Sequence, residues 1–261
     1  MYVKCIGVGI VNCIGVGICI WLVVVWLQMD QQSYFIGIKS GYASRRAVWR
    51  NSSCADWYAH HNVPYKFFIG VPIVKGHDLT AHHQGAYERP EERVLERALE
   101  QEALAHDDLY FLQFRDQYMD ITLKTIGILK FALENTRAHY IIVHDDEYCA
   151  DMRVIRELPP SPYLYAGYSL FQGTEYSIMK GPEGDVSPFF SGACSMLSRP
   201  LVAVLLGVDA FHTFMYGYYG TSSDDSNIGR WVKWAQEQHD IVVNYQQAPM
   251  LIRDLKNVPA W

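Results

Sequence analysis

The sequence has no excess of basic residues and no low-complexity tract. Its 261 residues include 22 Lys and Arg against 28 Asp and Glu, so the formal net charge is −6. A nucleic-acid-binding surface normally carries a basic patch, and this charge balance gives no reason to expect a nucleic-acid partner. Half of the residues are hydrophobic. That is enough for one sizeable core, and we expect one large domain rather than two.

Charge is missing altogether from residues 5–27. A run of this length, at about 1.5 Å per residue, can cross a hydrocarbon core of about 30 Å. Lys4 precedes the run and Asp30 follows it, so the positive-inside rule places residues 1–4 in the cytosol and residues 30–261 in a lumen. We expect a single-pass type II membrane anchor, and the alternative is a cleaved signal peptide. Both interpretations place the domain in the secretory pathway.

Cysteine is sparse outside this run. Three of the six Cys lie within residues 5–27, which leaves Cys54, Cys149 and Cys194. An odd number permits one disulfide and one free thiol in an oxidising lumen. The sequence leaves the pairing open.

Apolar runs alternate with segments of helical period from residue 33 onward. The expected strands are 33–40, 65–71, 109–114, 140–143 and 163–170. The expected helices are 43–50, 88–106, 120–135, 151–158, one that Ser198 caps and one that Asp224 opens. This alternation predicts an α/β domain with a largely parallel central sheet. We expect the charged residues of 88–106 to form mostly a solvated face with weak spaced pairs.

Three consecutive carboxylates, Asp145, Asp146 and Glu147, follow the apolar run Tyr140–Val143. This places them at the C-terminal end of a predicted strand, where open α/β sheets bind ligands. Crowded carboxylates repel one another, and a divalent cation removes that conflict. Hard oxygen ligands favour Mg²⁺ or Mn²⁺ over zinc, and such a cation keeps positions open for substrate phosphates. The stretch therefore predicts a metal–nucleotide site, and a solvated acidic turn is the alternative.

Two later features are candidates for the same site. Gly192 lies in a segment of small residues, where it either lets the backbone approach a ligand closely or marks a bulge. Asp224 and Asp225 open a predicted helix, and favourable charge at a helix N-terminus would explain both of them without any catalytic role.

The order of several motifs resembles a known family. The motifs are Arg45–Val48, the segment 114–125 with its Leu-Lys-Thr, the acidic triplet, Pro-Phe-Phe-Ser-Gly at 188–192, and Asp-Asp-Ser-Asn-Ile-Gly at 224–229. Together they resemble the β-1,3-glycosyltransferases of the galactosyltransferase/Fringe family, glycosyltransferase family 31, over about residues 33–245.

The resemblance implies a GT-A-type fold behind one N-terminal transmembrane helix, in the Golgi membrane. It further implies inverting transfer of a hexose, galactose or an N-acetylhexosamine, from a UDP-sugar to a glycan or glycoprotein hydroxyl, with formation of a β-1,3 linkage. The implied cation is Mn²⁺, with Mg²⁺ as a second possibility. The alternative is a non-catalytic, membrane-anchored relative that acts as a chaperone or glycan-binding module.

The resemblance also assigns roles to individual residues. Asp225 is expected to be the general base, and Asp145 and Glu147 are expected to bind the metal. The residues expected at or near the donor nucleotide are Arg45, Asp116, Lys124, Asp145, Asp146 and Gly192. Two departures stand out: Glu147 replaces the last Asp of the family motif, and His239 is the only His after Asp225. Either His239 is the third metal ligand, or water takes its place, or metal binding is weakened.

Overall fold

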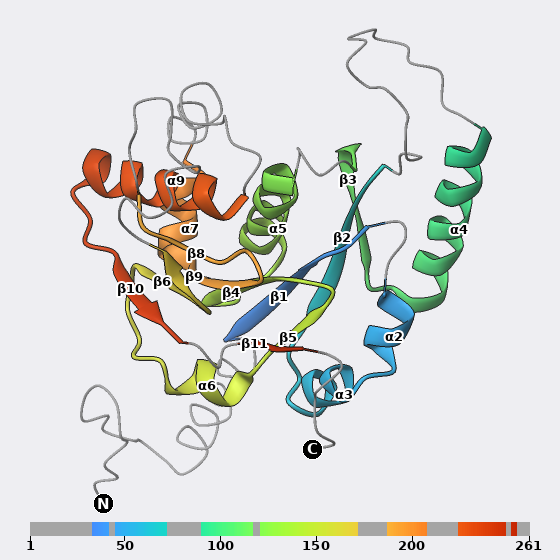
Figure 1. Ribbon diagram of the computed structural model, residues 1–261, viewed down its shortest axis with the longest axis horizontal. Helices are drawn as coiled ribbons and strands as arrows, with labels where there is room; N and C mark the ends of the chain where they lie inside the picture. Colours follow the sequence, from blue (N-terminus) through green and yellow to red (C-terminus); the bar gives the residue numbers. More distant parts are fainter. Residues whose placement is uncertain are drawn as a thin grey trace, which may run out of the picture.

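A computed structural model describes residues 33–41, 45–71, 90–116, 121–171, 187–207, 224–248 and 252–254. Its centre is a seven-stranded sheet in the order β10-β6-β9-β4-β1-β2-β3 (Figure 1). These strands are β1 (Tyr34–Lys39), β2 (Tyr65–Val71), β3 (Leu109–Arg115), β4 (Tyr140–Asp145), β6 (Leu164–Gly167), β9 (Cys194–Ser198) and β10 (Asn244–Gln247). Two small pairings, β5 (Tyr148–Ala150) with β11 (Ile252–Asp254) and β7 (Leu170–Phe171) with β8 (Phe189–Phe190), complete the strands of the described ranges.

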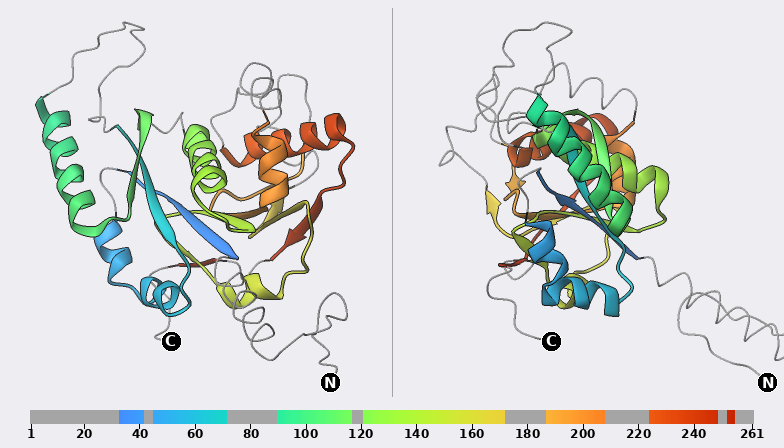
Figure 2. Two further views of the ribbon diagram at one scale, coloured as in Figure 1. Left: turned by 180° about the vertical axis from the view of Figure 1, so that it is seen from behind. Right: turned by 90° about the vertical axis from the view of Figure 1, so that its right-hand side faces the viewer.

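The helices of the described ranges lie on both faces of the sheet and beside its β3 edge. They are α2 (Arg46–Arg50), α3 (Ser53–His60), α4 (Pro90–His106), α5 (Ile121–Asn135), α6 (Met152–Glu157), α7 (Arg199–Leu205) and α9 (Asp224–His239). The apolar sides of α5, α7 and α9 pack with one face of the strands, while α2, α3 and α6 pack with the other. Figure 2 shows α4 beside β3, at the end of the molecule far from β10.

Side chains along β1 alternate between the two faces of the sheet, so this strand contributes to both hydrophobic cores. Phe35 belongs to the core under α5, whereas Ile36 and Ile38 point into the core with α2 and α3. Gly37 faces α5, and a Cβ at this position would overlap the side chain of Ile128. The missing side chain thus lets α5 lie close over the middle of the sheet.

The predicted fold class, an α/β domain with a largely parallel sheet, is confirmed. The neighbours β1–β2, β1–β4, β2–β3 and β6–β10 are parallel. The exception is β9, which runs antiparallel between β4 and β6. The sequence did not predict this reversal, nor the helix α3.

Two of the predictions concern the N-terminal residues. The anchor at residues 5–27 and the cytosolic residues 1–4 lie outside the described residues. Within the residues that the structure does describe, there is no helix with both the length and the apolar character needed to cross a bilayer.

Candidate active site

Several charged side chains meet at the edge of the sheet where β1 and β4 end. These strands are parallel neighbours, and Lys39 lies opposite Asp145 in their register. Because β9 runs the other way, the turn that contains Gly192 reaches the same edge just before β9 begins. The first residue of α9, Asp224, is also there, since it contacts Lys39 directly. The reversed strand thus brings the second half of the chain to the acidic triplet.

Lys39 is the centre of this arrangement, and the sequence did not single it out. Its Nζ lies 2.7 Å from Asp224 Oδ2, 3.2 Å from Asp145 Oδ1 and 2.9 Å from the carbonyl oxygen of Gly192. Its side chain is only 4% exposed. Burial alone would lower the pKa of Lys39, but the two carboxylates outweigh burial and raise it above the ordinary value. The one weak signal in the sequence was a charged residue that ends an otherwise apolar strand.

Asp224 and Asp225 are adjacent, but their surroundings give them different tasks. Asp224 is buried and accepts hydrogen bonds from Lys39 Nζ and, at 3.1 Å, from Thr125 Oγ1. These contacts fix the start of α9 to β1 and α5. Asp224 is therefore bound into the framework of the fold.

Two backbone N–H groups orient the carboxylate of Asp225. Its Oδ2 accepts from the Gly192 N–H at 3.2 Å and its Oδ1 accepts from the Ser226 N–H at 2.9 Å. Burial and the neighbouring Asp224 raise the pKa of Asp225, while the two N–H donors oppose that rise. A carboxylate whose pKa is raised in this way is a better proton acceptor than an ordinary exposed Asp.

Each carboxylate of the acidic triplet contacts a different residue of the segment 39–45, which runs from the last residue of β1 to the start of α2. Asp145 Oδ1 lies 3.2 Å from Lys39 Nζ, Asp146 Oδ2 accepts from Ser40 Oγ at 2.7 Å, and Glu147 Oε1 lies 2.7 Å from Arg45 Nη1. Burial and the charge of Asp224 raise the pKa of Asp145, and Lys39 opposes them. The repulsion expected from the sequence is thus relieved by cations and a hydroxyl of the chain itself.

His144 precedes the triplet but does not join the site. It is fully buried, its Nδ1 lies 2.8 Å from the carbonyl oxygen of Asp145, and its Nε2 lies 3.5 Å from Tyr58 Oη. Burial, with a smaller contribution from the charge of Lys39, lowers the pKa of His144 to about 4, although the contact with the Asp145 carbonyl opposes the change. Both ring nitrogens face protein groups, so His144 is a core residue.

Asp116 and Lys124, both predicted near the donor, form a buried ion pair beside the site. Lys124 Nζ lies 2.8 and 3.0 Å from the two carboxylate oxygens of Asp116 and donates to the Ser40 carbonyl at 2.6 Å. Asp116 also accepts from the Gly70 N–H at 3.3 Å. The pair connects β2, α5 and the end of β1, so the structure gives it a supporting position under the site.

A divalent cation would find two accessible carboxylates here. The side chains of Asp145 and Glu147 are 37% and 50% exposed, and their hard oxygens suit Mn²⁺ or Mg²⁺. In the described part of the chain, no three His, Cys, Asp or Glu side chains come together as a metal-binding group. Among the described residues, Asp145 and Glu147 could hold such a cation, with its remaining positions filled by water or substrate phosphates.

His239 does not belong to this group, and its prediction as a metal ligand is corrected. It ends α9, 14 residues after Asp225, which corresponds to about 21 Å along a helix. Its exposed ring lies against Trp234, with the ring centroids 5.9 Å apart. A cation bound to Asp145 and Glu147 is therefore out of reach of His239.

The pairing of the cysteines, which the sequence left open, is decided by the fold. Cys54 of α3 and Cys149 of β5 form a disulfide, while Cys194 is free and buried. Cys149 comes two residues after Glu147, so the disulfide fixes the strand that follows the acidic triplet. Burial raises the pKa of the Cys194 thiol, which keeps it protonated.

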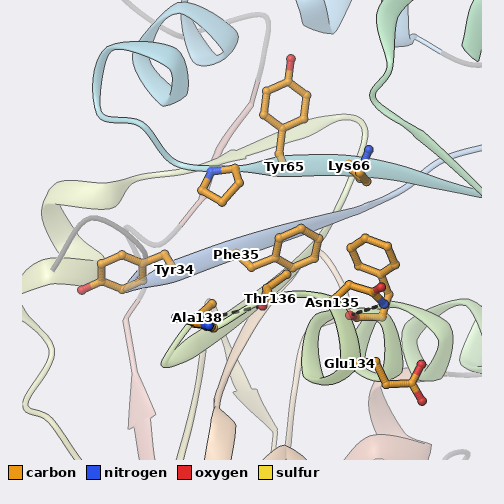
Figure 3. A pocket seen from close by; sticks show the side chains of 11 residues that line it. Tyr34, Phe35, Tyr65, Lys66, Glu134, Asn135, Thr136 and Ala138 are labelled. Carbon is orange, nitrogen blue, oxygen red and sulfur yellow. Dashed lines mark hydrogen bonds between the residues drawn. The ribbon is translucent and has the colours of Figure 1, made fainter. Parts of the chain in front are cut away.

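A cavity of about 560 Å³ lies at the opposite edge of the sheet, near the starts of β1 and β2 and the end of α5 (Figure 3). Three of its polar side chains are satisfied by nearby backbone. Lys66 donates to the Asp107 carbonyl, Asn135 to the Phe131 carbonyl and Thr136 to the Ala132 carbonyl. Of the charged residues that line it, Lys66 donates to a backbone carbonyl and Glu134 lies 3.9 Å from Lys130, so we take the other edge as the candidate site.

Comparisons with known proteins show which proteins this chain is similar to. Residues 86–162, which include the acidic triplet, match the family model described as Galactosyltransferase. The chain is 23% identical over 192 residues to a hydroxyproline O-galactosyltransferase of Arabidopsis thaliana, covering 69% of this chain and 27% of that protein. It is 29% identical over 138 residues to a UDP-GalNAc:beta-1,3-N-acetylgalactosaminyltransferase 1 of Sus scrofa, covering 48% of this chain and 42% of that protein.

Solved structures give a weaker likeness. The glycosyltransferase GlyE of Streptococcus pneumoniae aligns with a TM-score of 0.37 at 9% identity, over 83% of this chain and 45% of that one. The galactosyltransferase LgtC aligns with a TM-score of 0.38 at 9% identity, over 74% and 69% of the two chains. The chain spans less than half the length of both curated relatives. The sequence matches show that the chain is similar to galactosyltransferases and to an N-acetylgalactosaminyltransferase.

Proposed function

We propose that the chain is an inverting, metal-dependent glycosyltransferase with a GT-A-type fold. It transfers a hexose, galactose or an N-acetylhexosamine, from a UDP-sugar to a hydroxyl of a glycan or glycoprotein and forms a β-1,3 linkage. The observation that carries the proposal is that Lys39 and Gly192 bring Asp145 and Asp225 together at one edge of the sheet, with Glu147 two residues after Asp145. An acidic turn for a diphosphate-bound cation and a separate proton acceptor are the two parts that this transfer needs.

Asp225 has the position and environment of the general base. Its carboxylate, oriented by the N–H groups of Gly192 and Ser226, accepts the proton of the acceptor hydroxyl. As the acceptor oxygen loses this proton, it attacks the anomeric carbon. The bond from that carbon to the UDP oxygen breaks on the opposite face. A single displacement of this kind inverts the anomeric centre, so an α-linked donor gives a β-linked product.

Asp145 and Glu147 would hold the cation, which supplies positive charge to the leaving diphosphate when it is bound. Arg45 pairs with Glu147 across a half-exposed contact of 2.7 Å. It is therefore close enough to this turn to offer its guanidinium to a phosphate, for which a planar donor of this kind is well suited. Lys39 keeps Asp145 and the start of α9 at a fixed separation while these groups act.

The predicted anchor at residues 5–27 and the Golgi location complete the proposal. They are supported by the length of the uncharged run and by the charges on its two sides. With that topology, the candidate active site would act on glycans in the lumen.

The test is a donor screen with the full-length chain. UDP-sugars are incubated with and without acceptor glycans, in Mn²⁺ and in chelator, for the wild type, Asp225→Asn and Glu147→Ala. We expect UDP release from one donor, loss of release in chelator, and a fall of about 10²–10⁴-fold in Asp225→Asn. The exposed Glu237 on the same helix provides the control Glu237→Gln, with unchanged turnover.

Two outcomes would contradict the proposal. Turnover that survives Asp225→Asn would remove the general base, and the reaction would need another residue. A folded chain that binds neither UDP nor Mn²⁺ would indicate the non-catalytic alternative, a membrane-anchored chaperone or glycan-binding module.

A further inference from the structure

Glu102 lies on α4, outside the candidate site, but a chain of hydrogen bonds connects it to the acidic triplet. Its carboxylate accepts from Arg46 Nε at 2.8 Å and from Arg46 Nη2 at 2.7 Å, so both carboxylate oxygens are used. Arg46 is 3% exposed. A two-point contact with a buried guanidinium fixes the orientation of that group as well as its charge.

Ser40 passes this orientation on to the triplet. Arg46 Nη1 lies 3.0 Å from Ser40 Oγ, and Ser40 Oγ lies 2.7 Å from Asp146 Oδ2. The guanidinium can only donate and the hydroxyl carries one proton, so Arg46 donates to Ser40 and Ser40 donates to Asp146. The direction of every hydrogen bond from Glu102 to Asp146 is therefore determined.

The backbone of Ser40 is fixed as firmly as its side chain. Its N–H donates to the Phe68 carbonyl at 3.1 Å, and its carbonyl accepts from Lys124 Nζ at 2.6 Å. Ser40 itself is 3% exposed. The backbone of Ser40 is fixed and Arg46 orients its hydroxyl. The hydrogen bond from this hydroxyl therefore leaves the side chain of Asp146 little freedom to turn outward.

This link divides the three carboxylates into two groups. Asp146 is turned toward Ser40, while the side chains of Asp145 and Glu147 stay 37% and 50% exposed. We infer that Glu102 is a positioning residue: through Arg46 and Ser40 it holds Asp146 inward, so that Asp145 and Glu147 are presented to the ligand. That the ligand is a nucleotide diphosphate with a divalent cation rests on the proposed function, but the link to the turn does not.

The structure offers a matched control in the same cluster of ion pairs. Asp108 binds Arg50 through two contacts of 2.7 Å, and Arg50 also contacts Glu102 at 2.7 Å. Asp108 therefore shares the cluster but is a step further from Ser40. Asp108→Asn removes one carboxylate without cutting the link from Glu102 to the triplet.

The experiment is hydrogen exchange of the full-length chain, followed by mass spectrometry of the segment 145–150. The variants are Glu102→Gln, Ser40→Ala, the two combined, and Asp108→Asn. We expect exchange of this segment to accelerate about tenfold in Glu102→Gln and in Ser40→Ala, because each cuts the same link. The combined variant should exchange no faster than the single ones, since both act through one chain of contacts.

Binding of UDP in the presence of MnCl₂, measured by calorimetry, gives the second readout. Glu102→Gln and Ser40→Ala should weaken UDP binding about tenfold, while Asp108→Asn should leave it within about twofold. Unchanged exchange at 145–150 in Glu102→Gln, equal acceleration in Asp108→Asn, or additive effects in the combined variant would each overturn the inference. If the wild type binds no UDP but the exchange pattern holds, the proposed function fails and the positioning role stands.

Discussion

The two edges of the central sheet differ in how their polar groups are satisfied. At the edge where β1 and β4 end, Lys39 is buried among the charges of Asp145 and Asp224. At the other edge there is a cavity of about 560 Å³, but side chains such as Lys66 and Asn135 donate to nearby backbone carbonyls. One edge concentrates charge in a buried place, and the other holds a cavity whose polar side chains bond to nearby backbone.

This difference shows why volume alone does not identify the functional edge. Taking an ammonium group out of water costs several kcal/mol unless partners repay it. The partners of Lys39 come from β4, from the turn before β9 and from α9, so several elements must be placed together to keep it there. Such perturbed, interacting groups are more typical of functional sites than of ordinary surfaces.

Lys39→Met is expected to have the largest effect on this comparison. It leaves Asp224 buried without its cation, and we expect the free energy of unfolding to fall by about 3–5 kcal/mol. Chemical denaturation of the full-length chain measures the change. Lys66→Met is the control at the other edge, where the ammonium lies at the surface and a change of at most about 0.5 kcal/mol is expected. Similar losses in the two variants would remove the contrast between the edges.

Removal of the disulfide should have the next largest effect. Cys54 and Cys149 are separated by 95 residues, and their replacement by Ser should lower the free energy of unfolding by about 2–4 kcal/mol. The measurement is denaturation with and without reductant. The reductant should destabilise the wild type and leave the double variant unchanged, because Cys194 is unpaired. A reductant-insensitive wild type would contradict the prediction.

Acid should weaken the cluster that supports the active-site edge. The hydrogen bond from Arg46 is the largest influence on Glu102 and lowers its pKa from 4.5 to about 2, although burial opposes the change. The unfolded chain therefore takes up the proton first as the pH falls. The stabilisation by ionised Glu102 is complete above about pH 4.5 and is lost as the pH falls toward about 2.

Glu102→Gln should accordingly reduce the loss of stability between about pH 5 and about pH 3. Urea denaturation at the two pH values measures it, with the exposed Glu100→Gln on the same helix as control. An equal acid response in the wild type and in Glu102→Gln would show that the ion pair with Arg46 does not shift the titration.

The smallest effect is expected at the cavity edge. Arg137 is exposed and lines the cavity, so Arg137→Ala should change the free energy of unfolding by at most about 0.5 kcal/mol. Sugar transfer, measured with the donor found in the screen, should stay within about twofold of the wild type. A tenfold loss of transfer would move part of the function to this edge and reverse the comparison.

Local patterns predicted the elements that carry the site. The apolar run Tyr140–Val143 forms β4, which extends to Asp145, and the helical period after Asp120 forms α5 (Ile121–Asn135). Asp151 caps α6 by accepting from the Arg153 N–H at 3.0 Å. These features depend on side-chain period and on capping, which act over a few residues and are therefore visible in the sequence.

Other features depended on contacts that no local pattern reveals. The helix 88–106 was expected to present mostly solvated charges, but Glu102 bonds to the buried Arg46. His239 was assigned from its place in the sequence, but it lies at the far end of the 16-residue helix α9, away from Asp145. The reversal of β9 was likewise not predicted, because a strand has the same alternation in either direction.

The sequence by itself determined an α/β chain with an acidic triplet after a buried strand and with a pair of Asp residues opening a helix. Only the tertiary structure decided what each carboxylate contacts: Asp224 is bound to Lys39, whereas Asp225 accepts hydrogen bonds from the N–H groups of Gly192 and Ser226. The physical reason is distance along the chain. Lys39 and Asp224 are 185 residues apart in sequence, and their contact exists only because parallel strands and the reversed β9 bring both to one edge of the sheet.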